Sequence, residues 1–203
     1  MRWYRSAFAA AALVAAIAGT LGAGSADAAE PEKAIFAGGC FWCMEEAYEK
    51  VPGVLSVVSG YSGGEVDNPT YQQVSSGGTG HFEVVEVEYD PDAVSFKQLL
   101  DIFWHNIDPL DARGQFCDKG SQYLSAVFVA NDAEKQLAEA SKAEVEQQLG
   151  EKAATPILPE TTFYLAEDYH QNYYETNSAR YHFYKFGCGR PQRLEELWGK
   201  PAA

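Results

Sequence analysis

Apolar residues recur with a helical period in some stretches of this chain and alternate with polar residues in others. After Cys40, the apolar residues Phe41, Met44, Tyr48 and Val51 fall on one stripe at helical spacing. This stripe predicts a helix from about Cys40 to Val51 with one buried face. A Pro-Gly pair follows Val51 directly and is expected to end the helix.

Strict alternation is clearest in the strand predicted from His81 to Tyr89. Glu83 falls on its apolar face, together with Val85, Val87 and Tyr89. An ionised carboxyl group on an apolar face lacks hydration, so its pKa is expected to rise and the group to stay protonated. A protonated carboxylic acid in a pocket can act as a general acid. The alternative is a strand-end glutamate whose side chain bends out to water.

The remaining elements are predicted from apolar runs, caps and turn residues. The expected strands cover residues 34–37, 54–61, 123–129 and 161–165, and the expected helices cover residues 96–106 and 133–149. The glycine-rich residues 75–80 and the long segment 108–120 are expected to be loops. Mixed strands and helices without a linker predict one α+β domain. We expect a two-layer sandwich with a mixed β-sheet, a ferredoxin-like core, long loops and a mobile C-terminal tail in which glycines flank Cys188.

The first 28 residues have the pattern of a secretory signal peptide. Two arginines precede the apolar run Ala7–Leu21, and Ala26-Asp27-Ala28 fits a small-residue cleavage site. The run is shorter than the ~20 residues of a spanning helix. We therefore expect cleavage after residue 28 rather than a retained membrane anchor. The mature chain, residues 29–203, is then expected to be exported, to the periplasm or outside the cell, without a membrane association.

The charge of the chain narrows the choice of partners. Its formal net charge is −14 at pH 7, whereas nucleic-acid binding relies on basic patches. We expect no nucleic-acid partner, and we expect a monomer kept soluble by its charge. Four cysteines in an oxidising compartment could form structural disulfides, although a domain of this size does not need them.

Two of the cysteines, Cys40 and Cys43, lie on the first turn of the predicted helix, directly after Gly38-Gly39. Free backbone N–H groups and the helix dipole stabilise a thiolate there, and the glycines let a substrate come close. Three kinds of chemistry compete. They are a thiol enzyme with Cys40 as nucleophile, a general thiol–disulfide oxidoreductase that uses the Cys-Phe-Trp-Cys pair, and a metal site of cysteines and histidines.

The metal site is the weakest of these alternatives. No second closely spaced cysteine pair exists, and the histidines are scattered along the chain at positions 81, 105, 170 and 182. A peptide-binding module without turnover is the non-enzymatic alternative. The sequence therefore favours a thiol enzyme without naming its substrate.

Seven short motifs carry a resemblance to the A-type peptide-methionine sulfoxide reductases. They are Gly38-Gly39-Cys40-Phe41-Trp42, Tyr61-Ser62-Gly63-Gly64, Asn68-Pro69-Thr70-Tyr71, Gly80-His81-Phe82-Glu83-Val84-Val85, Tyr89-Asp90-Pro91, Gly120-Ser121-Gln122-Tyr123 and Ala166-Glu167-Asp168-Tyr169-His170-Gln171. They follow the order of that family from about Lys33 to Gly199. These enzymes repair oxidised methionine, with one enzyme type for each sulfoxide epimer. The resemblance implies reduction of the S epimer of methionine sulfoxide, in proteins above all.

The resemblance also implies roles for individual residues. Cys40 matches the nucleophile that attacks the sulfoxide sulfur, and Glu83 matches the acid that protonates the sulfoxide oxygen. Tyr71 and Tyr123 match the hydroxyls that bind this oxygen. Neutral hydrogen-bond donors are suited to binding this oxygen, because a second negative charge would disfavour the thiolate of Cys40.

Three further positions match parts of the family's site. Phe41 and Trp42 match the apolar wall that receives the S-methyl group, and Asp118 matches a carboxylate associated with the site. Neither a metal nor an organic cofactor is implied, so the reducing equivalents are expected from a thioredoxin-like dithiol.

The thiol that resolves the sulfenic acid of Cys40 has three candidates. Cys188 resembles the resolving cysteine of the family's C-terminal tail and is expected first. Cys43 stands where the family often has another residue, and it could close a local disulfide with Cys40. Cys117 stands where asparagine is common, beside Asp118, and could act as a relay. Reach and geometry decide between them.

Overall fold

The computed structural model describes residues 29–199. The predicted signal peptide, residues 1–28, lies outside the described part. Within residues 29–199 no helix is both long enough and apolar enough to cross a membrane.

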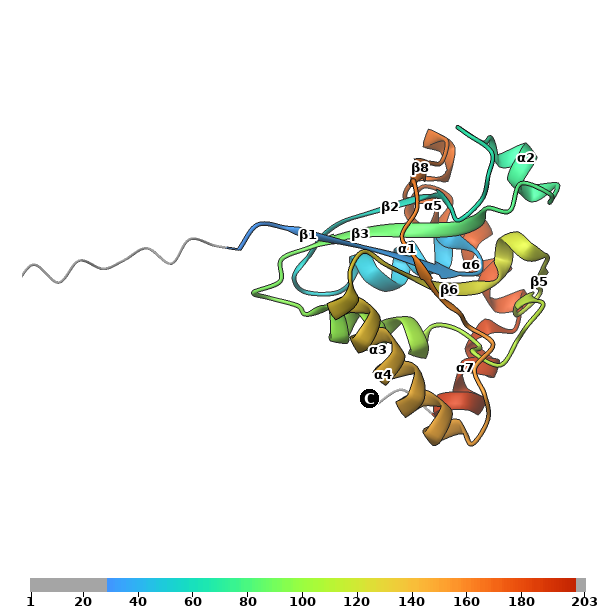
Figure 1. Ribbon diagram of the computed structural model, residues 1–203. Helices are drawn as coiled ribbons and strands as arrows, with labels where there is room; N and C mark the ends of the chain where they lie inside the picture. Colours follow the sequence, from blue (N-terminus) through green and yellow to red (C-terminus); the bar gives the residue numbers. More distant parts are fainter. Residues whose placement is uncertain (1–28, 200–203) are drawn as a thin grey trace, which may run out of the picture.

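A six-stranded sheet forms one layer of the molecule (Figure 1). Its strands, in spatial order, are β7 (Ile157–Pro159), β6 (Ser125–Val129), β1 (Glu32–Gly38), β3 (Phe82–Tyr89), β2 (Val54–Ser62) and β8 (Tyr164–Leu165). Every neighbouring pair is antiparallel except β6 and β7, which run parallel. The predicted mixed sheet is confirmed.

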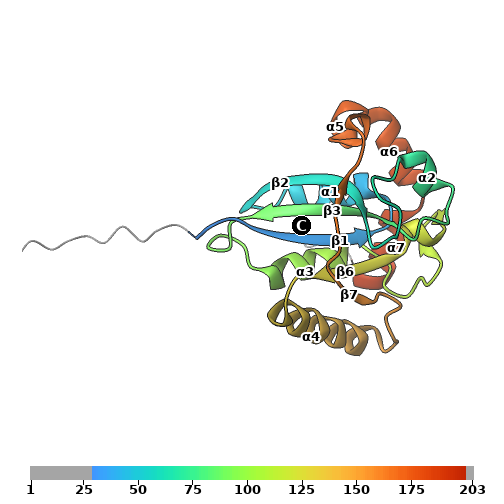
Figure 2. The same cartoon turned by 45° about the horizontal axis from the view of Figure 1, so that its top comes forward.

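Helices form the second layer. The helices are α1 (Phe41–Glu49), α2 (Tyr71–Ser75), α3 (Phe96–His105), α4 (Asp132–Leu149), α5 (Tyr173–Thr176), α6 (Ser178–Gly187) and α7 (Arg190–Trp198). Helix α1 joins β1 to β2, and α3 lies between β3 and β6 in the chain, while the four central strands follow the order β6-β1-β3-β2. This is the predicted ferredoxin-like core (Figure 2).

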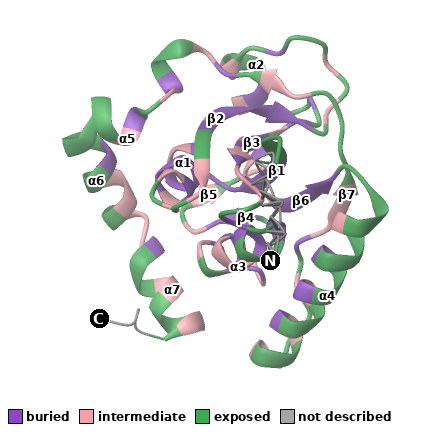
Figure 3. Ribbon diagram, turned by 90° about the vertical axis from the view of Figure 1, so that its left-hand side faces the viewer, coloured by how far each residue is buried: buried purple, intermediate pink, exposed green. Residues whose placement is uncertain are grey.

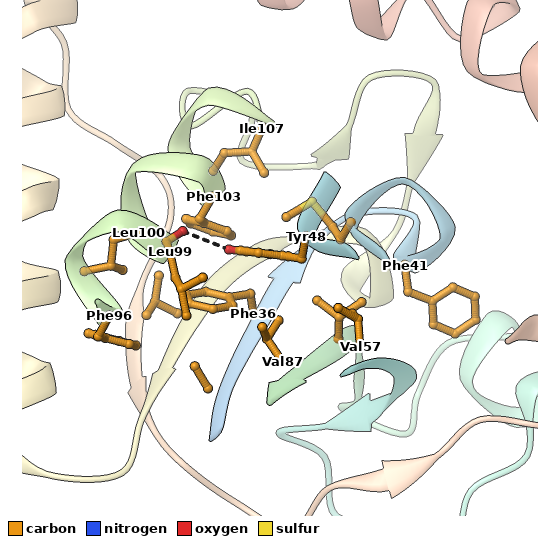
Figure 4. Packing of buried hydrophobic residues seen from close by; sticks show 14 of the residues in the cluster. Phe36, Phe41, Tyr48, Val57, Val87, Phe96, Leu99, Leu100, Phe103 and Ile107 are labelled. Atoms are coloured by element: carbon orange, nitrogen blue, oxygen red, sulfur yellow. Dashed lines mark hydrogen bonds between the residues drawn. The ribbon is translucent and has the colours of Figure 1, made fainter. Parts of the chain in front are cut away.

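The main core lies between the sheet and the helices α1, α3 and α4. Phe36 of β1 stacks on the rings of Tyr48, Phe96 and Phe103, with centroids 5.1, 6.1 and 5.5 Å away (Figure 4). Tyr48 Oη donates a hydrogen bond of 3.1 Å to the carbonyl oxygen of Leu99, which ties α1 to α3. These contacts fix the position of α1, whose first residues carry the chemistry.

Alternation along β3 appears as predicted. Glu83, Val85, Val87 and Tyr89 are buried, and on the other face Glu86 and Glu88 are only partly covered, although Val84 of that face is buried too. The outer surfaces of α4 and α6 are largely exposed (Figure 3). Strand periodicity therefore placed the Glu83 side chain in the interior.

Several local predictions differ from the structure. The strands predicted from residues 123 and 161 begin only at Ser125 and Tyr164, and three further differences lie near the site or in the helices. The helix predicted from residue 133 is capped by Asn131, whose side chain accepts from the Glu134 N–H at 2.9 Å, so it begins one residue earlier. The expected loop 108–120 contains a small hairpin of β4 (Gly114–Gln115) and β5 (Asp118–Lys119). The glycine-flanked tail is mostly helical: Cys188 ends α6, and Gly189 turns the chain into α7 with a φ of +71°.

Candidate active site

Cys40 lies at the turn that joins β1 to α1, as the N-cap residue of that helix. The preceding residue, Gly39, has a φ of +80°, and a Cβ atom there would lie 2.5 Å from the Cβ of Gln115. Only glycine satisfies both the dihedral angle and the close approach. Cys40 itself is buried, with 5% of its surface exposed. The glycine turn therefore delivers the thiol into the interior rather than to the surface.

Glu83 faces the start of α1 from the adjoining strand β3. The backbone N–H of Phe41 donates to Glu83 Oε2 at 3.1 Å, and only 2% of the residue is exposed. Burial raises the pKa of Glu83 to about 8. The carboxyl group is thus mostly protonated at neutral pH, and the alternative of a side chain that bends out to water is excluded.

A cavity of about 110 Å³ joins these groups. It is lined by Cys40, Phe41, Trp42, Tyr71, Glu83, Asp118, Tyr123 and Tyr184. All seven residues that the sequence assigned to the catalytic and substrate-binding set lie in this one cavity, although they come from distant parts of the chain. Its volume accommodates a small group rather than a whole side chain with its backbone.

The two predicted tyrosine hydroxyls face each other in this cavity. A hydrogen bond joins the side chains of Tyr71 and Tyr123, and burial raises the pKa of both phenols, so both stay protonated. Tyr71 opens α2, and its backbone N–H donates to Glu167 Oε1 at 2.8 Å. Glu167 also accepts from Tyr61 Oη at 2.9 Å. A second segment of chain therefore holds α2 and its tyrosine in place.

Two neighbours of the cavity were missed by sequence reasoning. Trp42 Nε1 donates to His170 Nδ1 at 3.2 Å, and the Trp42 indole stacks on the ring of Tyr173 at 3.8 Å. The hydroxyl of Tyr184 donates to Asp118 Oδ2. His170 lies in a recognised motif but offered no signal for its partner. Tyr184 belongs to an aromatic-rich helix that was expected only as a tail.

Cys40 and Cys43 form a coupled pair of free thiols. Burial raises the pKa of Cys40. The hydrogen bond from Cys40, followed by the charges of Arg190 and Lys185, lowers the pKa of Cys43 to about 6. Burial thus opposes ionisation of Cys40, whereas the hydrogen bond between the two thiols favours the thiolate of Cys43. The helix dipole alone, on which the sequence prediction relied, does not overcome the desolvation of Cys40.

The other two cysteines are bonded to each other. Cys117, on the turn of the β4–β5 hairpin, forms a disulfide with Cys188 at the end of α6, with Cα atoms 4.9 Å apart. Together with Asp118 they are the one group in the described part of the chain whose donor atoms could hold a metal ion. The disulfide occupies both sulfur atoms, so the group offers one carboxylate. Cys188, the first candidate for resolving Cys40, is thus paired with Cys117 instead.

Arg190 lies behind the catalytic turn. Its guanidinium donates to the carbonyl oxygens of Gly38, at 3.0 Å, and of Asn106, and it lies over the ring of Phe116 at 4.3 Å. The residue is 3% exposed. The last helix, α7, is in this way fastened to the end of β1, to the end of α3 and to the hairpin that carries Cys117.

Comparisons with known proteins agree with this geometry. A family model described as peptide methionine sulfoxide reductase matches residues 32–202. Peptide methionine sulfoxide reductase MsrA 2 of Rhizobium meliloti is 47% identical over 87% of this chain and 88% of its own length. MsrA of Bacillus subtilis is 48% identical over 83% of this chain and 96% of its own length.

Two solved structures share the fold. The reduced form of Mxr1 from Saccharomyces cerevisiae superimposes with a TM-score of 0.69 at 36% identity, over 73% of this chain and 86% of that one. Methionine sulfoxide reductase A of Corynebacterium diphtheriae gives a TM-score of 0.66 at 32% identity, over 73% and 76%. The chain therefore belongs to the peptide methionine sulfoxide reductases of the A type, oxidoreductases that reduce methionine sulfoxide by thiol chemistry.

Proposed function

We propose that this chain reduces the S epimer of methionine sulfoxide with Cys40 as the nucleophile and Glu83 as the proton donor. The observation that carries the proposal is the single small cavity in which a thiol, a carboxylic acid of raised pKa and three tyrosine hydroxyls meet an apolar wall. Phe41 and Trp42 supply that wall and receive the S-methyl group.

The first step transfers the sulfoxide oxygen to Cys40. The proton that Cys40 holds in the resting pair passes to Cys43, and the Cys40 thiolate attacks the sulfoxide sulfur. Glu83 gives a proton to the sulfoxide oxygen, while Tyr71 and Tyr123 donate hydrogen bonds to it. Methionine leaves in reduced form, and Cys40 keeps the oxygen as a sulfenic acid. Neutral donors are favourable here because the attacking group is already negative.

Cys43 is the best placed of the three candidate thiols to resolve the sulfenic acid. It is three residues from Cys40, is hydrogen-bonded to it and has a pKa lowered to about 6. Condensation forms the Cys40–Cys43 disulfide and releases water. The Cys40–Cys43 disulfide then exchanges with the reduced thiols of Cys117 and Cys188. This exchange restores the thiols of Cys40 and Cys43 and leaves the Cys117–Cys188 disulfide. A thioredoxin-like dithiol reopens this second disulfide, whose Cys117 is exposed.

Serine variants at the three candidate positions separate the possible routes. We expect Cys43→Ser to complete one rapid turnover and then to slow about tenfold or more, because no thiol adjoins the sulfenic acid. Cys117→Ser and Cys188→Ser are expected to keep turnover with dithiothreitol and to lose it with thioredoxin. Rapid-quench counting of methionine per enzyme measures both. If Cys117→Ser alone stopped after one turnover with dithiothreitol, direct resolution by Cys117 would replace this route.

The experiment that tests the proposed reaction compares the two epimers. Peptides that carry either the S or the R form of methionine sulfoxide are incubated with the enzyme and dithiothreitol, and the methionine formed is quantified by chromatography. Only the S form is expected to react. Equal rates for both epimers, or reduction of insulin disulfides without any methionine formed, would replace the proposal by non-specific thiol exchange.

We further propose that the enzyme works outside the cytoplasm as a monomer. The support is the signal-like pattern of residues 1–28 and the strong net negative charge. Fractionation of cells that express the full chain, followed by mass determination of the N-terminus, tests export and cleavage together.

A further inference from the structure

A second and larger cavity lies beyond Cys43. Its volume is about 630 Å³, within the range of small-ligand sites. Cys43 is one of its lining residues, whereas none of the residues that line the 110 Å³ pocket takes part. The two free thiols of α1 therefore line different cavities: Cys40 the small pocket and Cys43 the large cavity.

The wall of this cavity combines an apolar side with charged groups of both signs, of which the Arg190 guanidinium is the one that could face an anion. Pro191, Leu194 and Trp198 of α7 form the apolar side. Arg190 adds a guanidinium whose two hydrogen bonds go to neutral carbonyl groups, so these bonds leave its charge in place. Lys185, paired with Glu46, and the acidic Glu195 complete the charged groups of the lining. A small molecule with an apolar part and a carboxylate fits such a wall.

The position of Cys43 restricts what can reach it. Cys43 is only 3% exposed, so it offers almost no surface to the thiol of a folded protein. Because Cys43 lines the cavity, a small thiol bound there is the reductant that can come closest to it. The Cys117–Cys188 disulfide, whose Cys117 is exposed, remains open to a protein.

We propose that the 630 Å³ cavity is a binding site for a low-molecular-weight anionic thiol of about tripeptide size, which reduces the Cys40–Cys43 disulfide from the side of Cys43. This rests on the proposed function, in which that disulfide forms. The bound thiolate attacks Cys43 Sγ, the Cys40–Cys43 bond breaks, and Cys40 leaves as the thiolate. A second thiol molecule attacks the mixed disulfide, which releases Cys43 and a small-molecule disulfide. The enzyme then has two reductants, a small thiol and a protein.

Leu194 offers a pair of substitutions that change only the cavity. Leu194→Trp places an indole in the cavity and narrows it, and is expected to lower kcat/KM for glutathione as reductant by about tenfold or more, while Leu194→Ala opens it and keeps the rate. Neither is expected to alter the first turnover, measured without reductant, or the rate with thioredoxin. Leu137→Trp, on the exposed side of α4, is the matched control for an added indole.

The charge of the wall gives a second readout. For the wild type, the rate is expected to saturate with glutathione and to need several-fold higher concentrations of cysteamine, a cationic thiol. In Cys40→Ser, Cys43 has no neighbouring thiol with which to form a disulfide, and oxidised glutathione is expected to modify it. Adding Leu194→Trp to the same chain is expected to suppress this adduct, as measured by peptide mapping.

Failure of the small-thiol site gives a different result in these experiments from failure of the proposed function. A rate that stays linear in glutathione and is equal in the Leu194→Trp variant overturns the small-thiol site while the first turnover persists. Loss of the first turnover in the wild type would instead overturn the reaction itself. Loss of the thioredoxin-driven rate in Leu194→Trp would show that the substitution had disturbed α7. The wild-type comparison then decides: a rate that does not saturate with glutathione, or that needs no more cysteamine than glutathione, overturns the site.

Discussion

Replacement of Cys40 by serine is expected to abolish methionine sulfoxide reduction, with a loss of about four orders of magnitude or more in kcat/KM. A serine hydroxyl stays protonated at neutral pH and cannot take up the sulfoxide oxygen as a stable intermediate. Single-turnover assays of methionine formation measure the loss. The substitution replaces a buried sulfur by a smaller oxygen, so the fold should be retained.

Cys43→Ser is the matched control for this variant, since it removes a buried thiol from the same helix three residues away. It should still form about one methionine per enzyme. A Cys40→Ser enzyme with a normal first turnover, or a Cys43→Ser enzyme with none, would move the nucleophile to Cys43.

Replacement of Glu83 by glutamine is expected to slow the first turnover by about 10²- to 10⁴-fold. An amide keeps the hydrogen-bonding shape but gives up no proton to the sulfoxide oxygen. The pKa of about 8 predicts a second signature in the wild type: the rate falls as the pH rises through about 8, because ionised Glu83 has no proton to donate. Glu83→Gln should lack this limb, and a variant that retained it would assign the titration to another group.

In Glu83→Gln, stability is expected to change in the opposite direction to activity. The folded protein holds the Glu83 proton to about pH 8, whereas the unfolded chain releases it near the ordinary value of 4.5. Wild-type stability is therefore lost as the pH rises between these values, by up to ~1.4 kcal/mol per pH unit. Glutamine has no such dependence. Between pH 5 and pH 8, the urea midpoint of Glu83→Gln should rise relative to that of the wild type. This result would show that the variant loses activity through the missing proton and not through unfolding.

Sequence patterns predicted the fold where the periodicity was strong. Alternation in β3 placed Glu83 inside, and the stripe of α1 placed Met44 and Tyr48 in the core. The two-layer α+β class is confirmed by the sheet order and by the related structures. The tail was harder, because the glycines beside Cys188 suggest mobility, whereas the second of them serves as the left-handed link between two helices.

The sequence predicted which residues form the candidate site, but not the bonds that join them. Motif residues from four distant segments do share one cavity. Spacing in the sequence does not encode the distances on which three of these bonds depend. They are the disulfide of Cys117 with Cys188, the hydrogen bond of Tyr184 to Asp118 and the hydrogen bond between the Cys40 and Cys43 thiols. Desolvation of Cys40 likewise follows from burial, which a helix-start pattern does not report.

Arg190 determines when the catalytic turn can form during synthesis of the chain. The catalytic turn is complete only when the side chain of Arg190, 152 residues downstream, has bonded to the carbonyl of Gly38. A chain emerging from the ribosome carries Cys40 long before it carries α7. The buried, desolvated setting of the thiol pair is therefore assembled only after α7 has emerged, and until then Cys40 is exposed as an ordinary cysteine.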